Sequence, residues 1–322
     1  MKRITNAIAL AVVLFALLPV STRAAELLIP VGKIIGLQLS DDTVTVAAFD
    51  DTLGENAKAA GLKIGDEIVK IDGAQIDCAE DVRSALSGCD ANVELTVRRS
   101  GKVSTLNLCP NVTADGPRLG VYLRQGIAGI GTVTWYDPDT GKFGTLGHGV
   151  SDAKGNLLNM KTGNAYEAQI VSVKKGKCGD PGQLKGSADA VSTFGTLLRN
   201  TPQGVFGITK QGWLGEPIPV ASCEEVKTGP ATIRSTVSGD TPREYSVEIL
   251  KIYPKDRTDC RNLLIKVTDP GLLAATGGIV QGMSGSPIIQ NGKLVGAVTH
   301  VLVNDPTTGY GIVIESMLDA AA

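Results

Sequence analysis

The feature that most constrains the fold is a glycine-framed hexapeptide at residues 282–287, GMSGSP. Apolar sequence spaced by glycines precedes it, and two isoleucines at positions 288 and 289 follow it. The turn pair Asn291-Gly292 then leads into a second apolar run at residues 294–298. Since glycine adopts backbone geometry that other residues resist, the segment predicts a tight bend that feeds a β-hairpin.

Ser284 places a hydroxyl at the centre of this bend. In such a bend the main chain can turn its N–H groups toward a substrate carbonyl, as in serine peptidases built from two β-barrels. We therefore predict Ser284 as a nucleophile and the N–H groups of Gly282 and Ser284 as an oxyanion hole. The hexapeptide by itself also fits an ordinary Gly/Ser/Pro turn between strands.

The 322 residues suffice for two ordinary domains, and the net charge of −2 gives no indication of a nucleic-acid partner. Residues 1–25 have the order of a secretory signal: Lys2 and Arg3, an apolar run at 7–20, then small residues. The run falls short of the roughly 20 residues that span a bilayer. A cleaved signal is favoured over a retained anchor or a buried helix, and we expect the remainder to be exported.

Six cysteines follow, and their even number in an exported chain permits disulfides. They are Cys78, Cys89, Cys109, Cys178, Cys223 and Cys260. Three fall in each half, so pairing cannot be internal to both halves, and free thiols are equally compatible. With no Cys-x-x-Cys and only two histidines, we expect no zinc site and no other metal or organic cofactor.

Residues 26–110 alternate strands with two short helices. Strands are predicted at 34–39 and 43–49, a helix that stops at Gly61, a strand before the hairpin turn Asp72-Gly73, a helix at 78–87, and a final hairpin. Together with residues 60–68 (AGLKIGDEI) and 71–73 (IDG), this order resembles a PDZ domain.

The PDZ resemblance implies that a peptide binds by strand addition, with backbone N–H groups holding its carboxylate. The matching loop in this chain consists of Ile34, Ile35, Gly36 and Leu37, although these residues could equally pack only the core. The ligand would be the C-terminus of another protein or a segment of this chain.

Residues 111–322 have a different pattern, in which short strands are separated by Gly, Pro and Asp turns. Strands are predicted at 130–136, 143–147, 168–173, 204–208, 244–252 and 263–267. Such a pattern favours an all-β barrel or sandwich.

Two histidines are available as a general base, and His148 is the better candidate. It lies between glycines at the end of a strand, whereas His300 follows the Ser284 hairpin too closely for the His-before-Ser order of two-barrel peptidases. Imidazole suits the task because its ordinary pKa lies near neutrality.

Asp269 is the predicted orienting carboxylate, since it follows a strand and precedes Ser284. Asp180 and Asp189 also lie between His148 and Ser284 and are rivals. Asp before Pro-Gly is often only a turn former. A Ser–Lys dyad is a lesser alternative, because no lysine lies in a comparable glycine frame.

Three segments carry a resemblance to a family: residues 144–149 (GTLGHG), 277–287 (GGIVQGMSGSP) and 292–301 (GKLVGAVTHV). Together they closely resemble stage IV sporulation protein B, a family of serine endopeptidases of spore-forming Firmicutes. The resemblance implies a mainly β chain, with a PDZ domain at 26–110 and a chymotrypsin-like double β-barrel peptidase domain at 111–322. It also implies His148 as base, Ser284 as nucleophile and Asp269 as the acidic member; the six cysteines depart from the family pattern.

The resemblance further implies export from the forespore into the space between the two spore membranes, self-cleavage near the N-terminus, and a form that is membrane-associated or released. The substrate would be a membrane regulator that silences an intramembrane protease, so that its cleavage permits maturation of a mother-cell sigma factor. Two alternatives are a general extracytoplasmic quality-control protease, which usually carries its PDZ domain after the protease, and a non-catalytic PDZ protein. The intact His148 and Ser284 argue against the latter.

Overall fold

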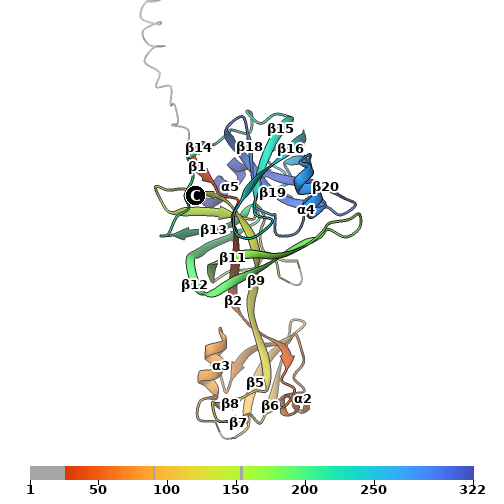
Figure 1. The fold of residues 1–322 in the computed structure, drawn as a ribbon. Coiled ribbons are helices and arrows are strands. Elements are labelled where there is room, and N and C mark those ends of the chain that lie inside the picture. Colours follow the sequence, from red (N-terminus) through yellow and green to blue (C-terminus); the bar gives the residue numbers. More distant parts are fainter. Residues whose placement is uncertain (1–25, 90, 153–154) are drawn as a thin grey trace, which may run out of the picture.

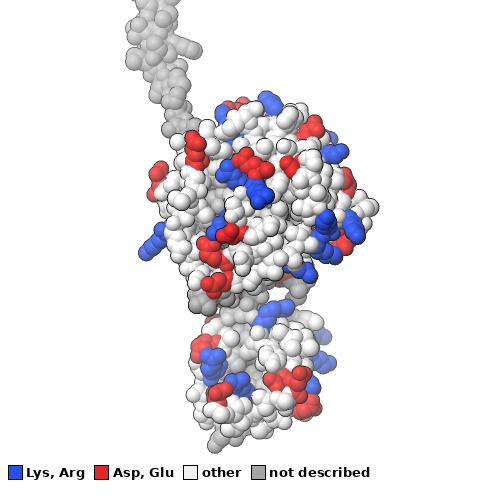
Figure 2. Space-filling model, in the orientation of Figure 1, with Lys and Arg blue, Asp and Glu red and all other residues white. Residues whose placement is uncertain are grey.

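The computed structural model describes residues 26–89, 91–152 and 155–322. It consists of a small part and a large part, and two long strands run through both of them (Figure 1). On the face shown in Figure 2, acidic and basic side chains are interspersed over both parts, in keeping with the net charge of −2. The predicted mainly β fold, in which a small N-terminal part precedes a larger barrel part, is confirmed.

The small part is the PDZ domain, and its turns lie where the sequence places them. Asp72 and Gly73 both have positive φ angles, 45° and 79°, as a two-residue hairpin turn requires. Asp81 accepts the N–H of Cys78 at 2.9 Å and so caps the second helix. Its elements are α2 (Glu55–Ala59), β3 (Glu67–Ile71), β4 (Ala74–Gln75), α3 (Ala79–Leu86), β5 (Val93–Arg99), β6 (Lys102–Leu108), β7 (Asn111–Thr113) and β8 (Gly116–Arg118).

The two long strands are β2 (Ile34–Phe49) and β9 (Val121–Tyr136), which pair antiparallel along most of their length. Residues 44–49 of β2 face 121–125 of β9 within the PDZ domain, and residues 34–39 face 127–132 within the large part. The register shifts between Leu39 and Val44, opposite the crossing from one part to the other. The two strands predicted at 34–39 and 43–49 are therefore one interrupted strand.

The first barrel of the large part closes through six strands, because β2 and β9 pair with each other at the end of the series. Trp213 packs edge-on against Phe143 and Phe194 in its core, with ring centroids 5.4 and 5.2 Å away. The order is β9, β10 (Lys142–Thr145), β13 (Gly204–Thr209), β12 (Gln183–Thr201), β11 (Thr162–Lys174) and β2, and β1 (Leu27–Pro30) and β14 (Ile218–Pro219) extend it beyond β9.

The second barrel is also closed and six-stranded. Its apolar core extends to Ile34 and Leu184 of the first barrel, so the two barrels pack as one body. The order is β15 (Gly229–Ser235), β16 (Arg243–Ile252), β17 (Leu263–Val267), β20 (Asp305–Val313), β19 (Lys293–Leu302) and β18 (Pro287–Gln290), with helices α4 (Pro270–Thr276) and α5 (Ile314–Ala321) outside.

The structure corrects the predicted carboxylate-binding loop. Ile34, Ile35, Gly36 and Leu37 are buried residues of β2, and both edges of this segment are paired: Gly36 faces Ile130 on one side and Tyr166 on the other. A strand with two paired edges has no free N–H groups for a peptide. In their strand pairing, β1 and residues 34–39 join the first barrel, while residues 121–125 of β9 join the PDZ sheet.

The predicted signal at residues 1–25 lies outside the described residues. Among the residues that are described, no helix is both long enough and apolar enough to cross a bilayer. All six cysteines are free thiols in the structure.

Candidate active site

The loop that carries Ser284 adopts a conformation that depends on glycine. Gly285 has φ +95°, and a Cβ there would lie 2.0 Å from the Thr132 carbonyl oxygen. The loop is closed by hydrogen bonds from the N–H of Met283 to Val280 and from the N–H of Ser286 to Met283. It therefore forms the tight bend into the β18–β19 hairpin that the sequence predicts.

Two N–H groups of this loop are unused. The N–H groups of Met283, Gly285 and Ser286 all donate to backbone carbonyls, whereas those of Gly282 and Ser284 donate to no acceptor among the described residues. Both residues are partly exposed. These are the two groups that the sequence predicts as the oxyanion hole, and donors that stand free beside a nucleophile can stabilise a developing oxyanion.

Strand β9 of the first barrel anchors the Ser284 loop of the second. The N–H of Thr132 donates to the Ser284 carbonyl at 3.0 Å, and its hydroxyl donates to the Gly282 carbonyl at 2.9 Å. The hydroxyl of Thr134 donates to the Gly285 carbonyl at 2.7 Å. Both threonines are fully buried. Sequence reasoning missed these residues, because threonines in a strand give no local sign of a partner 150 positions away.

His148 follows a strained turn at the end of β10. Leu146 and Gly147 both have left-handed φ angles, +70° and +67°, and such strain in a buried non-glycine residue is characteristic of functional sites. The Nδ1 of His148 lies 2.9 Å from the Gly149 carbonyl oxygen, so Nδ1 carries the proton and donates. Nε2 then keeps its lone pair. Burial lowers the pKa of His148 below 6.5, against the raising effect of that hydrogen bond, and the ring is neutral at pH 7.

Asn200 on β12 holds the loop that follows His148. Its amide nitrogen donates to the carbonyls of Val150 and Leu158, at 2.8 and 2.9 Å, and its oxygen accepts the N–H of Val150 at 2.9 Å. These contacts hold the backbone of Val150, two residues after His148, and so help to position the imidazole. No sequence signal singled out this residue.

Thr299 is the common neighbour of Ser284, of Gly147, which precedes His148, and of His300, which follows Thr299 in the chain. The Ser284 hydroxyl donates to the Thr299 carbonyl at 2.7 Å, and a Cβ on Gly147 would lie 2.9 Å from the Thr299 side chain. The ring centroids of His148 and His300 are 5.2 Å apart. Because the Ser284 hydroxyl is bonded to Thr299, transfer of its proton to His148 requires a turn about the Cα–Cβ bond of Ser284, a fast motion in a partly exposed side chain.

Asp269 does not reach this cluster. Its carboxylate caps α4, accepting the N–H of Leu272 at 2.8 Å and of Ser246 at 3.5 Å. The predicted acidic member is therefore observed as a helix cap, with no hydrogen bond to His148 among the described residues.

The two rival carboxylates are exposed. Asp180 pairs with Lys174 at 2.8 Å, and both side chains are half exposed. Asp189 is exposed on β12. The one hydrogen bond that His148 makes within the described residues goes to Gly149.

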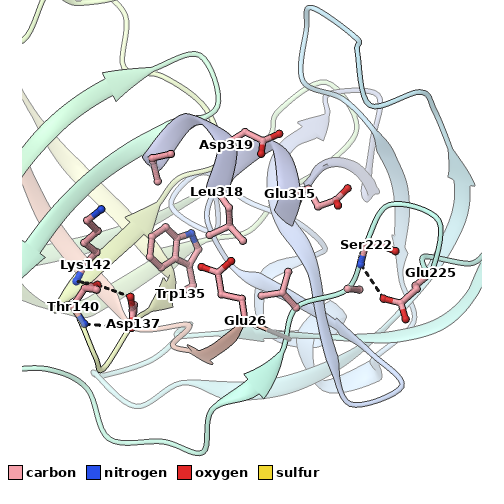
Figure 3. A pocket seen from close by; sticks show the side chains of 14 residues that line it. Glu26, Trp135, Asp137, Thr140, Lys142, Ser222, Glu225, Glu315, Leu318 and Asp319 are labelled. Carbon is pink, nitrogen blue, oxygen red and sulfur yellow. Dashed lines mark hydrogen bonds between the residues drawn. The ribbon is translucent and has the colours of Figure 1, made fainter. Parts of the chain in front are cut away.

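A cavity of about 580 Å³ lies beside α5, away from these residues (Figure 3). Glu26, Trp135 and Leu318 line it together with two acids of α5, Glu315 and Asp319. None of Ser284, His148 and His300 is among its lining residues. The candidate active site is thus defined by its polar groups and not by this cavity.

Comparison with known proteins identifies two domains in the chain. A family model described as SpoIVB peptidase S55 matches residues 115–318, and a PDZ domain model matches residues 34–109. Two curated relatives, one from Bartonella henselae and one from Agrobacterium fabrum, are both named "putative zinc metalloprotease". They are 34% identical over 85 and 98 residues, which cover 26% and 30% of this chain, and the chain spans about a quarter of their length, 23% and 25%.

Among solved structures, the Rv3671c protease of Mycobacterium tuberculosis is similar. Its active form matches with a TM-score of 0.37 at 16% identity, covering 62% of this chain and 73% of that protein. An inactive form matches with a TM-score of 0.35 at 16% identity, covering 61% and 85%. The family model covers more than half of the chain, and on that ground the chain belongs to the SpoIVB peptidase S55 family and is a serine endopeptidase with an N-terminal PDZ domain.

Proposed function

We propose that this protein is an exported serine endopeptidase of sporulation. In this proposal it cuts itself near its N-terminus and then cleaves a membrane regulator between the two forespore membranes, which activates an intramembrane protease and the processing of a mother-cell sigma factor. Membership of the SpoIVB peptidase family and the signal-like residues 1–25 support the proposal.

The proposed chemistry is acyl transfer at Ser284. His148 Nε2 takes the hydroxyl proton as Ser284 Oγ attacks the peptide carbonyl, and the N–H groups of Gly282 and Ser284 hold the oxyanion. His148 then gives the proton to the leaving amine, and water hydrolyses the acyl-enzyme by the same route. The observation that carries this assignment is the pair of unused N–H groups beside a serine whose loop also adjoins a neutral histidine.

We also place the peptide-binding edge of the PDZ domain on β9. Residues 121–125 pair with β2 on one edge, and within the described residues no strand pairs with the other edge. Helix α3 lies against that side, and Gln125 ties the two together by donating to the Asp77 carbonyl at 3.0 Å and accepting the Ala79 N–H at 3.4 Å. An open strand edge beside a helix suits strand addition by the C-terminus of another protein or by a segment of this chain.

The groove proposal predicts different effects for two neighbouring residues of α3. Ala85 is partly buried against the PDZ core, whereas Arg83 is exposed. Ala85→Arg places a long charged side chain on the partly buried side of α3 and should abolish binding of fluorescent C-terminal peptides. Arg83→Ala should bind them like wild type. Equal binding by both variants would exclude this groove.

The test of the catalytic assignment compares purified full-length wild type with Ser284→Ala, His148→Ala and, as a matched control, the exposed serine variant Ser238→Ala. Self-processing is followed by gel and the new N-terminus by mass spectrometry, and a fluorophosphonate probe reports the reactive serine. Wild type and Ser238→Ala should shorten and take up the probe, and the other two variants should remain intact and unlabelled. Shortening of Ser284→Ala at the wild-type rate would exclude Ser284 as the nucleophile.

A further inference from the structure

A second imidazole, that of His300, lies beside His148. In the described part of the chain, the ring of His148 hydrogen-bonds only to Gly149, and Asp269 is occupied as a helix cap. The neighbour that faces the His148 ring is His300, at a centroid distance of 5.2 Å and an interplanar angle of 41°.

The backbone of His300 is fixed by the strand that also receives Ser284. His300 pairs with Tyr310 across the β19–β20 ladder, and the preceding carbonyl, that of Thr299, accepts the Ser284 hydroxyl. The position of His300 relative to the nucleophile is therefore set by a paired strand and not by a loop. Residues that orient reacting groups are most effective on such rigid elements.

One ring nitrogen of His300 is unsatisfied. Its Nδ1 is buried and has no hydrogen-bond partner among the described residues. A buried polar atom without a partner costs free energy, which an apolar ring of the same size would avoid. Packing alone therefore does not account for a histidine here, and the nitrogen is free to accept a hydrogen bond that forms at another stage of the reaction.

We infer that His300 is a positioning residue whose Nδ1 lone pair stabilises the protonated form of His148. The inference rests on the proposed roles of Ser284 and His148. When Ser284 attacks, its proton moves to His148 Nε2, and the Nδ1–H of the resulting cation is shared between the Gly149 carbonyl and His300. The proton then leaves with the amine of the departing peptide, so both rings end neutral.

The separation of the two rings is compatible with this contact. Two imidazoles joined by an N–H···N bond of about 2.9 Å have centroids about 5 Å apart, since each nitrogen lies just over 1 Å from its own centroid. The observed 5.2 Å agrees with that separation.

The charges around His300 keep it neutral, as an acceptor must be. Burial, then the charges of His148 and Arg261, lower the pKa of His300 to about 4, and Asp259 opposes them. The Arg261 guanidinium stacks on the ring of Tyr310, the strand partner of His300, at 5.2 Å. At pH 7 the ring therefore carries one N–H and one free lone pair.

Two substitutions in the full-length protein separate hydrogen-bond acceptance from packing. His300→Phe keeps a flat ring and removes the nitrogen, and His300→Gln keeps an acceptor of similar reach. Val303→Ala, at an exposed position in the same hairpin, is the control. Each variant is assayed for kcat and KM on an unstructured protein substrate as a function of pH, and for labelling of Ser284 by a fluorophosphonate probe.

His300→Phe should lower kcat at least about 10-fold with KM within about 2-fold of wild type. The acid limb of the kcat–pH profile of this variant should move to lower pH, because protonated His148 loses a stabilising partner and the pKa of His148 therefore falls. His300→Gln should recover most of kcat, and Val303→Ala should match wild type.

The outcomes distinguish this inference from the proposed function. If His300→Phe keeps the wild-type kcat and pH profile, or if His300→Gln is no better than His300→Phe, the acceptor role is wrong while a labelled Ser284 still stands as nucleophile. If wild type neither takes up the probe at Ser284 nor cleaves, the proposed site itself fails, and the role of His300 fails with it.

Discussion

The PDZ domain and the peptidase each bury a polar cluster, and the two clusters are built in opposite ways. Asp66 in the PDZ domain is 1% exposed; its oxygens accept Arg99 Nε and Nη2, both at 2.6 Å, and the Lys63 N–H at 2.8 Å. In the peptidase, His300 Nδ1 and the N–H groups of Gly282 and Ser284 have no partner among the described residues. A satisfied cluster specifies a fold, whereas open hydrogen-bonding positions mark where a substrate or a transition state binds.

The largest expected effect concerns the open cluster. His148→Ala should lower kcat/KM by about 10⁴, or about 5.5 kcal/mol of transition-state stabilisation, because the proton of Ser284 loses its acceptor. The free energy of unfolding should change by less than about 1 kcal/mol, since the half-buried ring makes a single hydrogen bond. Peptidase assays and urea unfolding check the two parts. A large loss of stability would show that this cluster serves the fold.

The satisfied cluster should behave in the reverse manner. Asp66→Ala should destabilise the PDZ domain by about 2–3 kcal/mol, because it leaves the Lys63 N–H unpaired and Arg99 without its partner. Activity per folded molecule on an unstructured substrate should stay at the wild-type level. The exposed pair of Asp115 and Arg118 is the control, and Asp115→Ala should lose nothing measurable in urea unfolding.

The same carboxylate predicts a pH dependence. Burial would raise the pKa of Asp66, but the hydrogen bonds from Arg99 and Lys63 outweigh it and hold the pKa below 3.8. The stabilisation is therefore present above pH 3.8 and is lost as pH falls through the folded-state pKa. Asp66→Asn should be less stable than wild type at neutral pH, and the two should converge in acid. A constant difference at all pH values would contradict the shift.

A smaller effect is expected where β9 holds the catalytic loop. Thr132→Val removes the hydroxyl that binds the Gly282 carbonyl and should lower kcat about 10-fold, or about 1.4 kcal/mol, by loosening the oxyanion donors. Thr209→Val is the matched control, because this buried threonine donates to Phe194 in the first barrel, away from the loop. It should lose comparable stability and keep kcat. Equal kcat losses in the two variants would contradict the anchoring role.

The smallest effect is expected at Asp269. As the N-cap of α4, Asp269→Ala should cost about 1 kcal/mol of stability, and Asp269→Asn, which still caps, much less. Both variants should keep kcat within about 2-fold of wild type, because the carboxylate does not contact His148. A folded Asp269→Asn protein without activity would restore this residue to the catalytic group.

Local signals in the sequence were sufficient for much of the fold, and they also give the candidate nucleophile and base. Glycine frames single out Ser284 and His148, and turn pairs such as Asp72-Gly73 place the hairpins. The Asp-Pro start of α4 was visible as well, but in sequence an N-cap and a turn look alike. His300, Asn200 and Thr132 gain their roles only from contacts between distant segments, which leave no local pattern.

The pairing of residues 34–39 within the barrel could not be predicted, for a related reason. The signature at residues 60–73 is local and identifies the module, but the partners of residues 34–39 lie about a hundred positions away in β9 and β11. Their apolar sequence fits a strand of either part equally well. Burial on both faces, which distinguishes the barrel strand, depends on those distant partners.

The continuity of β2 and β9 has a mechanical consequence. The chain passes between the PDZ domain and the peptidase only within these two paired strands, so no flexible linker joins the two parts. Any swing of the PDZ domain must bend a two-stranded ribbon or break its ladder. The ribbon should bend most easily where the register shifts between Leu39 and Val44, beside Gly126. Six residues further along β9 is Thr132, whose hydroxyl binds the Ser284 loop, so a bend at this point would be transmitted to the candidate active site.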